Sequence, residues 1–253
     1  KYLGDHFGEV IWGSDLASST TIRDRYYFSD ATKQETSIFA KTTYKFDEKL
    51  TGYVDLQGRF INYETKGLTS KRNPLNVDKL YSFFNPKFGL TYSLNSNNNL
   101  YTSFAIANRE PNRDDFENGI NKHETLNDYE LGWRYKSKNI RVNSNVYYMR
   151  YKNQLVLTGG LDDVGSPIRA TSDSSHRLGL EIEADINATK TLNIKPNIAL
   201  STNKNKDFSS TINGVTENLG DTPISFSPDL ILGNTLTYKV LNNLQLAILS
   251  KYV

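Results

Sequence analysis

Hydrophobic and polar residues alternate with a period of two along most of this chain, and helical periodicity is weak. In one segment Tyr129, Leu131 and Trp133 alternate with Asp128 and Glu130. Such alternation places apolar side chains on one face of a β-strand and polar side chains on the other. The pattern predicts ten strands, with one or two more near 8–12 and 22–28, over the ranges 33–46, 50–64, 80–93, 99–108, 125–136, 140–156, 176–188, 192–204, 228–240 and 244–253.

The connections between these strands alternate between short and long. The short ones are polar turns at 47–49, 95–99, 137–139, 189–191 and 241–243. The long ones cover 65–79, 109–124, 157–175 and 205–227. Outer-membrane barrels show this asymmetry, with short periplasmic turns and long extracellular loops, and strands of about 9–11 residues cross a bilayer. We therefore expect an all-β fold, an antiparallel up-and-down transmembrane β-barrel.

The polar faces of the predicted strands carry charges of both signs. We expect these side chains to face a water-filled lumen, where neighbours on adjacent strands can pair. The residues assigned to the lumen are Asp55, Arg59, Glu130, Arg134, Glu181 and Glu183. A soluble sheet with one solvated face also alternates, so a soluble all-β binding or adhesin module remains the alternative at this point.

Composition excludes several classes of protein. The net charge is +2, from 30 basic and 28 acidic residues, and no basic run is interleaved with aromatics, so we expect no nucleic-acid partner. No cysteine is present, which excludes disulfides and thiolate metal sites. Histidine occurs only at positions 6, 123 and 176, and we find no catalytic set. We therefore expect neither an enzyme, nor a metal site, nor a cofactor.

Four segments resemble parts of TonB-dependent receptors from Bacteroides-type bacteria. They are Ser103–Phe116, Glu124–Tyr135, Asn145–Leu155 and Arg177–Asp185. The resemblance covers nearly the whole chain and is most specific over about 100–208. Each segment is typical of a barrel strand or of a strand-to-loop junction. The resemblance therefore indicates a family more than a substrate.

The resemblance implies a barrel of about 22 strands around a plugged lumen. The sequence provides about half of such a barrel, and we find no plug and no TonB-contacting segment, so residues 1–253 are expected to form a partial barrel domain. The implied function is TonB-dependent import of a nutrient across the bacterial outer membrane: a siderophore, haem, cobalamin or a glycan. The implied partners are the TonB complex through a plug outside this chain, the small nutrient ligand and the lipid bilayer. A glycan importer would also need a surface lipoprotein. A passive porin-type barrel is the second alternative.

The densest polar cluster follows the strand at 99–108. Its arginines could meet an anionic ligand, because guanidinium groups bind carboxylates and similar anions bidentately. The other interpretation is structural, with opposite charges pairing to hold the loop in place. The candidate ligand-binding residues, all in predicted loops, are Arg109, Glu110, Asn112, Arg113, Asp114, Asp115 and Arg169.

Overall fold

The computed structural model describes residues 10–11, 23–24, 28–69, 73–161, 167–212 and 215–253. These residues are mostly β-strand, with one short helix, α2 (Arg113–Glu117). The long strands are β3 (Phe28–Lys45), β4 (Leu50–Leu68), β5 (Pro74–Asn95), β6 (Asn98–Arg109), β7 (Glu124–Lys136), β8 (Ile140–Leu161), β9 (Pro167–Asn187), β10 (Leu192–Lys206), β14 (Leu230–Leu241) and β15 (Leu244–Tyr252). The short strands are β1 (Val10–Ile11), β2 (Arg23–Asp24), β11 (Ser209–Ile212), β12 (Val215–Asn218) and β13 (Thr222–Pro223).

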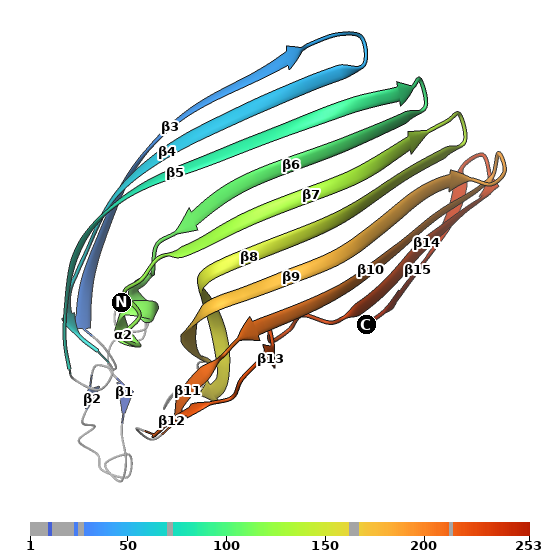
Figure 1. Cartoon of the computed structure of the whole chain (residues 1–253). Helices are drawn as coiled ribbons and strands as arrows, with labels where there is room; N and C mark the ends of the chain where they lie inside the picture. The colour runs from blue at the N-terminus through green and yellow to red at the C-terminus, as the bar shows by residue number, and fades with distance from the viewer. Residues whose placement is uncertain (1–9, 12–22, 25–27, 70–72, 162–166, 213–214) are drawn as a thin grey trace. The chain divides into compact units, whose positions relative to one another are not determined.

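The long strands form one antiparallel sheet with the order β15-β14-β10-β9-β8-β7-β6-β5-β4-β3 (Figure 1). Each long strand therefore pairs with the long strands that precede and follow it in sequence, which is the up-and-down arrangement that the alternation predicts. The short strand β13 pairs with β10, while β1 pairs with β2 and β11 pairs with β12 in two small hairpins. The prediction of an antiparallel up-and-down sheet is confirmed.

The predicted long connections need correction, because much of their length is strand. The range 65–79 contains the end of β4 and the start of β5, and 157–175 contains the end of β8 and the start of β9. The range 205–227 contains β11, β12 and β13, and 109–124 contains α2. Backbone pairing continues through these extensions, but apolar residues alternate in them only over short runs such as Leu75 and Val77, so the hydrophobic pattern used for the prediction does not mark them as strand. Of the strands expected near 8–12 and 22–28, the described residues form β1, β2 and the first residue of β3, and the remaining residues lie outside the described ranges.

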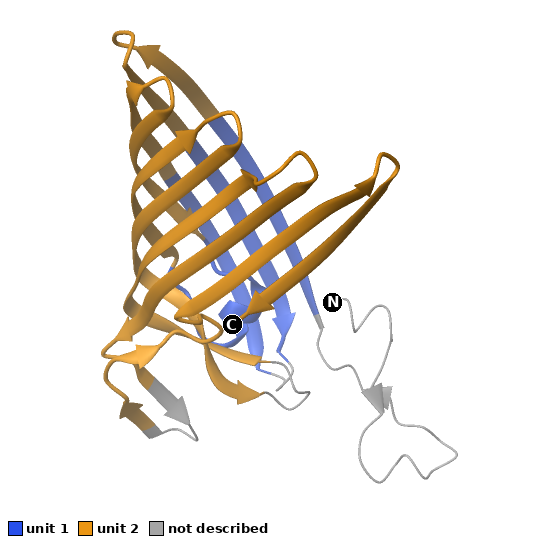
Figure 2. Cartoon of the chain, turned by 90° about the vertical axis from the view of Figure 1, so that its right-hand side faces the viewer, with its two compact units in different colours: residues 1–38, 58–83, 110–122 blue, residues 39–57, 84–109, 123–253 orange. Residues whose placement is uncertain are grey.

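The chain divides into two compact units (Figure 2). Unit 1 comprises residues 1–38, 58–83 and 110–122, and unit 2 comprises residues 39–57, 84–109 and 123–253. The strands β3, β4 and β5 each contribute one part to unit 1 and the other part to unit 2. All five short turns belong to unit 2, where they lie together at one end of its strands (Figure 1).

One face of the sheet in unit 2 is apolar and exposed. Its register aligns Phe104 with Tyr129 and Tyr129 with Tyr148 on successive strands. Leu131 and Val146 are directly opposite each other one step further along, and they are 60% and 47% exposed. A contiguous face of large exposed apolar side chains is unusual in a soluble protein and suits contact with lipid. No helix among the described residues has the length and apolar character needed to cross a membrane.

The opposite face of unit 2 is polar and is packed by tyrosine rings over glycines. A Cβ atom placed on any of these glycines would lie within 2.1–2.4 Å of an atom of the neighbouring ring. The pairs are Tyr53 over Gly89, Tyr101 over Gly132 and Tyr147 over Gly179. Glycine is needed at these positions because the ring occupies the space of its missing side chain, and the ring in turn covers the exposed backbone.

Unit 1 has a small hydrophobic core of its own. Ile61, Tyr63, Leu75 and Phe83, from β4 and β5, cluster with Phe116 of α2. The rings of Tyr63 and Phe116 are stacked, with centroids 5.5 Å apart. The helix therefore covers apolar side chains of two strands, and each of these five side chains is at most 9% exposed.

Candidate functional site

The predicted lumen residues of unit 2 share its polar face. Glu130 lies opposite Ser103, whose hydroxyl donates to Glu130 Oε2 at 3.0 Å. Further along the same face, the Asn143 amide donates to Glu183 Oε1 at 2.7 Å, and Glu181 lies opposite Asn145. This arrangement is a ladder of charges and amides, as alternation predicts. That the face borders a lumen stays a prediction.

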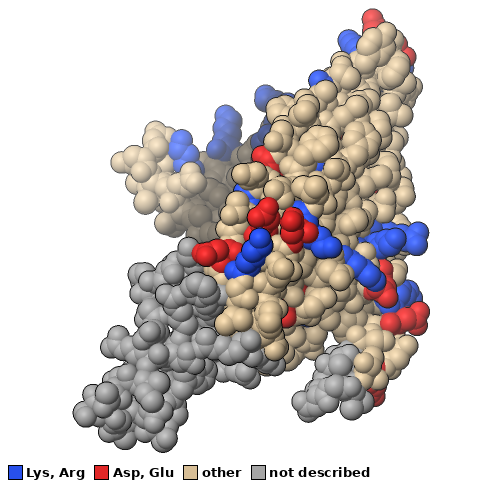
Figure 3. Space-filling model, turned by 90° about the vertical axis from the view of Figure 1, so that its left-hand side faces the viewer, with Lys and Arg blue, Asp and Glu red and all other residues tan. Residues whose placement is uncertain are grey.

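Two further predicted lumen residues of unit 2 make weaker contacts. The Arg134 guanidinium carbon lies 4.1 Å from the centre of the Tyr101 ring, a cation–π geometry. The Asp55 carboxylate is 4.0 Å from Lys41 Nζ, and these side chains are 36% and 64% exposed. Because such exposed pairs contribute little to stability, this part of the face keeps its charges available to solvent or to a partner. On the face drawn in Figure 3, acidic and basic side chains likewise gather in mixed clusters.

The predicted lumen residue Arg59 lies in unit 1 and belongs to a four-residue ion cluster. Its Nε donates to Glu35 Oε1 at 2.7 Å, and its terminal nitrogen lies 3.4 Å from Glu110 Oε2. Lys33 Nζ lies 2.6 Å from Glu110 Oε1 and 3.2 Å from Glu35 Oε2. The guanidinium carbon is also 5.9 Å from the centre of the Phe83 ring. Two cations and two carboxylates thus alternate around a closed ring, in which Glu110 is only 10% exposed.

The segment after Glu110 is held by helix capping. Asn112 is the N-cap of α2, its side chain accepts from the backbone N–H of Asp115, and the Asp115 carboxylate accepts from the backbone N–H of Asn112. This reciprocal capping box satisfies two backbone donors at the start of the helix. Arg113 donates to the Ser29 hydroxyl at 2.9 Å and lies 2.9 Å from Glu117.

The structure separates the candidate ligand-binding residues into two sets. Glu110, Asn112, Arg113 and Asp115 make the contacts within unit 1 described above. The others are more exposed: the Arg109 side chain is 54% exposed and lies 3.4 Å from Glu124, the Asp114 side chain is 72% exposed, and Arg169 is exposed on β9, opposite Leu157.

Sequence reasoning did not find Lys33 and Glu35 as members of the ion cluster. Both lie on one face of β3, two residues apart, and that spacing is the only signal the sequence offered. Their meeting with Arg59 and Glu110 depends on strand register and on the path of the chain after β6. Among the described residues, no group of three or more His, Asp or Glu side chains is arranged to hold a metal ion.

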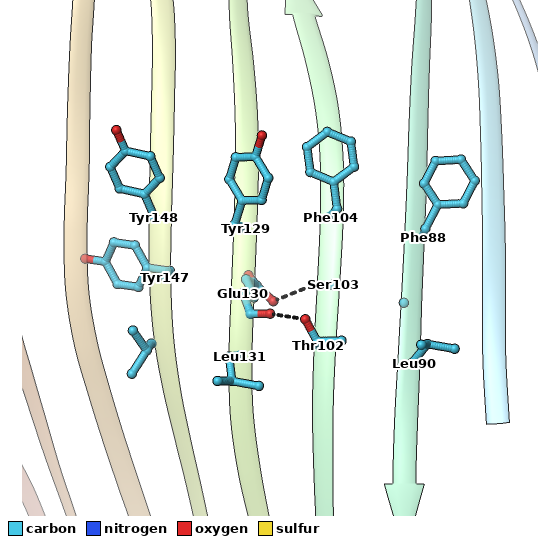
Figure 4. Close-up of a pocket in the computed structure, with 12 residues that line it drawn as sticks. Phe88, Leu90, Thr102, Ser103, Phe104, Tyr129, Glu130, Leu131, Tyr147 and Tyr148 are labelled. Carbon is cyan, nitrogen blue, oxygen red and sulfur yellow. Dashed lines mark hydrogen bonds between the residues drawn. The ribbon is translucent and has the colours of Figure 1, made fainter. Parts of the chain in front are cut away.

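A shallow hollow of about 460 Å³ lies on the sheet of unit 2. Its apolar lining includes a row of rings from four successive strands: Phe88, Phe104, Tyr129 and Tyr148 (Figure 4). Leu90, Leu131 and Val146 line it next to that row. Neighbouring rings are close, with centroids 4.9 Å apart for Phe104 and Tyr129 and 6.3 Å apart for Tyr129 and Tyr148. The hollow therefore suits an apolar occupant such as a hydrocarbon chain.

Solved structures of outer-membrane receptors share this fold. The siderophore receptor PiuA from Acinetobacter baumannii superposes with a TM-score of 0.71 at 18% identity, over 87% of this chain and 33% of PiuA. The copper transporter OprC gives 0.69 at 16% identity, over 89% and 35%. The ferric-catecholate import receptor Fiu from Escherichia coli K12 gives 0.64 at 15% identity, over 93% and 36%. No curated protein matches the sequence.

The chain spans about a third of the length of these solved structures. Their identities to this chain are low, so they bear on the fold, and they confirm that the sheet is barrel wall. The family itself is shown by sequence, because the model described as "TonB dependent receptor-like, beta-barrel" matches residues 3–252. The chain therefore belongs to the TonB-dependent receptor β-barrel family of the bacterial outer membrane.

Proposed function

We propose that the whole protein imports a nutrient across the outer membrane with energy delivered by TonB, and that this chain supplies barrel wall and loops. The observation that carries the proposal is the family match over residues 3–252. Structures that share the fold are named as a siderophore receptor, a ferric-catecholate import receptor and a copper transporter. The substrate classes proposed for this protein are a siderophore, haem, cobalamin or a glycan.

The polar face of unit 2 supports a role for this wall in holding a plug. Side-chain oxygens of Asp128 and Asn145 on this face are buried and have no hydrogen-bond partner among the described residues. Buried polar atoms are normally paired with protein or ordered water, so these oxygens favour bound water within this face. Its exposed charges, such as Asp55, are available to a partner. A plug domain, which TonB would act upon, is the partner we propose for it, together with water. The resemblance to receptors of Bacteroides-type bacteria stays a prediction.

For ligand contact we propose the exposed candidates, which are Arg109 and Arg169 in unit 2 and Asp114 in unit 1. The remaining candidates position the segment that carries Asp114. Replacing Arg109 or Arg169 by Ala in the full-length protein should raise the Kd for the ligand without lowering the amount of folded receptor. Lys138→Ala, in a short turn, is the matched control for the loss of one exposed cation. Unchanged ligand affinity in both arginine variants would remove them from the proposed site.

The experiment that tests the function uses the full-length gene. A strain that lacks the gene is grown with iron as ferric siderophore or haem, with cobalamin, or with glycans as the limiting nutrient, and the gene is then restored with TonB either intact or disrupted. We expect one nutrient to require both the gene and TonB. Uptake that needs the gene but persists without TonB would establish the passive porin instead. Growth that is indifferent to the gene on every nutrient would contradict the import proposal.

A further inference from the structure

Basic side chains gather on the apolar face of unit 2, just beyond the row of rings. Strand register places Arg150 opposite His176, and His176 opposite Lys204. One step further from the rings, Lys152 and Lys206 both lie opposite Ser174. Because alternate residues of a strand share a face, Arg150 and Lys152 follow Tyr148 on the face that carries the rings. We refer to Arg150, Lys152, His176, Lys204 and Lys206 as the basic patch.

The charges of the basic patch are only partly neutralised by the protein. Lys206 is paired with Asp221. Arg150, Lys152 and Lys204 are exposed and form no direct ion pair among the described residues, and the Asp221 carboxylate attracts Lys204 only from a longer distance. The neighbours that register brings into these rows are Thr125, Asn127 and Ser174, which are neutral. Three unpaired cations on one face therefore create a local positive potential that favours an anion.

The surroundings of the patch identify the kind of anion. On one side the patch adjoins the row of rings, since His176 is 6.2 Å from Tyr148 between ring centroids. Beyond the rings lies the apolar hollow with Leu131 and Val146. The patch lies toward the long connections of the strands, the end that is extracellular in outer-membrane barrels. The positive charge, the aromatic rings and the apolar surface thus follow one another along the strands. A lipid in the outer leaflet presents its phosphate groups, its interfacial region and its hydrocarbon chains in the same order.

We propose that the basic patch and the adjoining hollow form a binding site for a phosphate-bearing lipid of the outer leaflet. Arg150, Lys152 and Lys204 contact the phosphate groups, since guanidinium and ammonium groups are strong phosphate donors. An acyl chain lies along the hollow past the rings of Tyr129 and Tyr148. The proposal rests on the outer-membrane location of the family and is independent of which nutrient the protein imports.

The test uses the full-length receptor in detergent micelles, titrated with fluorescent bis-phosphorylated lipid A. Replacing the three unpaired cations together (R150Q/K152Q/K204Q) should weaken lipid retention on the order of 100-fold, since each cation near an anionic lipid surface contributes a few-fold. The matched control is K49Q/K138Q/K190Q, which removes the same charge from the short turns and should retain the lipid like the unaltered receptor. The charge-conserving variant R150K/K152R/K204R should also retain it, which separates lost charge from misfolding.

Two further ligands distinguish a lipid from a free anion. Lipid A without its phosphates should bind the unaltered receptor and the triple Gln variant equally weakly. Inorganic phosphate at millimolar concentration should not displace the bound lipid. Equal retention by the triple Gln variant and the unaltered receptor would overturn the proposal. So would an equal loss in the short-turn control, or displacement by inorganic phosphate alone.

Discussion

The same face of β4 and β5 has opposite character in the two units. In unit 1 it carries Ile61, Tyr63 and Phe83, which are buried in a core with a residue of α2. In unit 2 it carries Tyr53 and Asp55, and polar side chains continue across the neighbouring strands. The difference lies in what covers the face, because in unit 1 a capped helix packs on the strands. The alternation of a strand therefore shows that it has two faces but does not show which partner each face meets.

Ion pairing follows the same contrast. In unit 1 Arg59 lies 2.7 Å from Glu35 and 3.4 Å from Glu110, and these side chains are 10–29% exposed. In unit 2 the Lys41–Asp55 pair is 4.0 Å long and its members are more exposed. Because the side chains around Arg59 are partly buried, the loss of one charge there leaves the others without a partner. Solvent screens the exposed Lys41–Asp55 pair, so its two charges depend less on each other. Four changes to the molecule test this contrast.

The largest effect is expected from Phe116→Ala in α2. It removes a ring from the core of unit 1 and leaves a cavity beside Tyr63, which costs about 3–5 kcal/mol for a buried phenylalanine. We expect residues 110–122 to become sensitive to protease while the strands of unit 2 stay protected from amide hydrogen exchange. Phe226→Ala is the control, because that ring is 90% exposed. Equal protease resistance of the two variants would show that the helix does not depend on this core.

The next effect concerns the packing of the polar face in unit 2. Gly132→Ala would place a Cβ 2.2 Å from the Tyr101 ring, so the ring must move, at a cost of about 1–3 kcal/mol. The temperature at which the purified full-length protein unfolds in detergent should fall, and adding Tyr101→Ala should recover part of the loss. Gly58→Ala is the control, since its nearest atom is 3.6 Å away. A matching decrease for Gly58→Ala would contradict the steric explanation.

Removing Arg59 should have a smaller effect than these packing changes. Arg59→Gln leaves Glu35 and Glu110 close to each other with Lys33 alone between them, and we expect a loss of about 1–2 kcal/mol. Lys41→Gln, on the same face in unit 2, should change stability by less than about 0.5 kcal/mol. Denaturant unfolding of the full-length protein at low and high salt measures both. If the two losses were equal, burial would not distinguish the two ion-pair sites.

The smallest effect is expected at the turn that contains Asp47. The backbone N–H groups of Lys49 and Leu50 donate to Asp47 Oδ1 at 2.6 and 2.8 Å and lower the pKa of this carboxyl below its usual value of 3.8. Because the folded-state pKa is lowered, the charged carboxylate stabilises the turn fully at pH values above the ordinary pKa. This stabilisation is lost as the pH falls through the folded-state pKa. Titration of the Asp47 carboxyl by NMR should give a midpoint below 3.8. Asp47→Ala should shift the amide resonances of Lys49 and Leu50, whereas Glu48→Ala should leave them in place.

Much of the strand arrangement could be predicted, because local pattern and short turns specify it together. Alternation such as that of Tyr129, Leu131 and Trp133 marks one face of a strand. A turn of only a few residues makes each strand pair with the strand that precedes it in the sequence. The extensions beyond the apolar band escaped prediction, as did α2. A helix of five residues gives no periodicity to detect, although its capping residues Asn112 and Asp115 were present in the sequence.

The candidate site was less accessible to prediction. The segment 109–115 stood out by its charge, but the sequence did not show that Glu110 turns to Lys33 and Arg59 while Asp114 stays exposed. Nor did it show that Arg150, His176 and Lys204 lie side by side. These residues are 26 and 28 positions apart in the chain and meet only through the register of three strands.

The sequence by itself determined the period of the strands, the positions of the short turns and the family, because these depend on local side-chain chemistry and on recurring segments. Only the tertiary structure decided where α2 packs, which charges pair and which rows of side chains form. Those outcomes depend on contacts between residues far apart in the chain, and a shift of one residue in register would move a side chain to the opposite face. The basic patch and the core around Phe116 both belong to this second group.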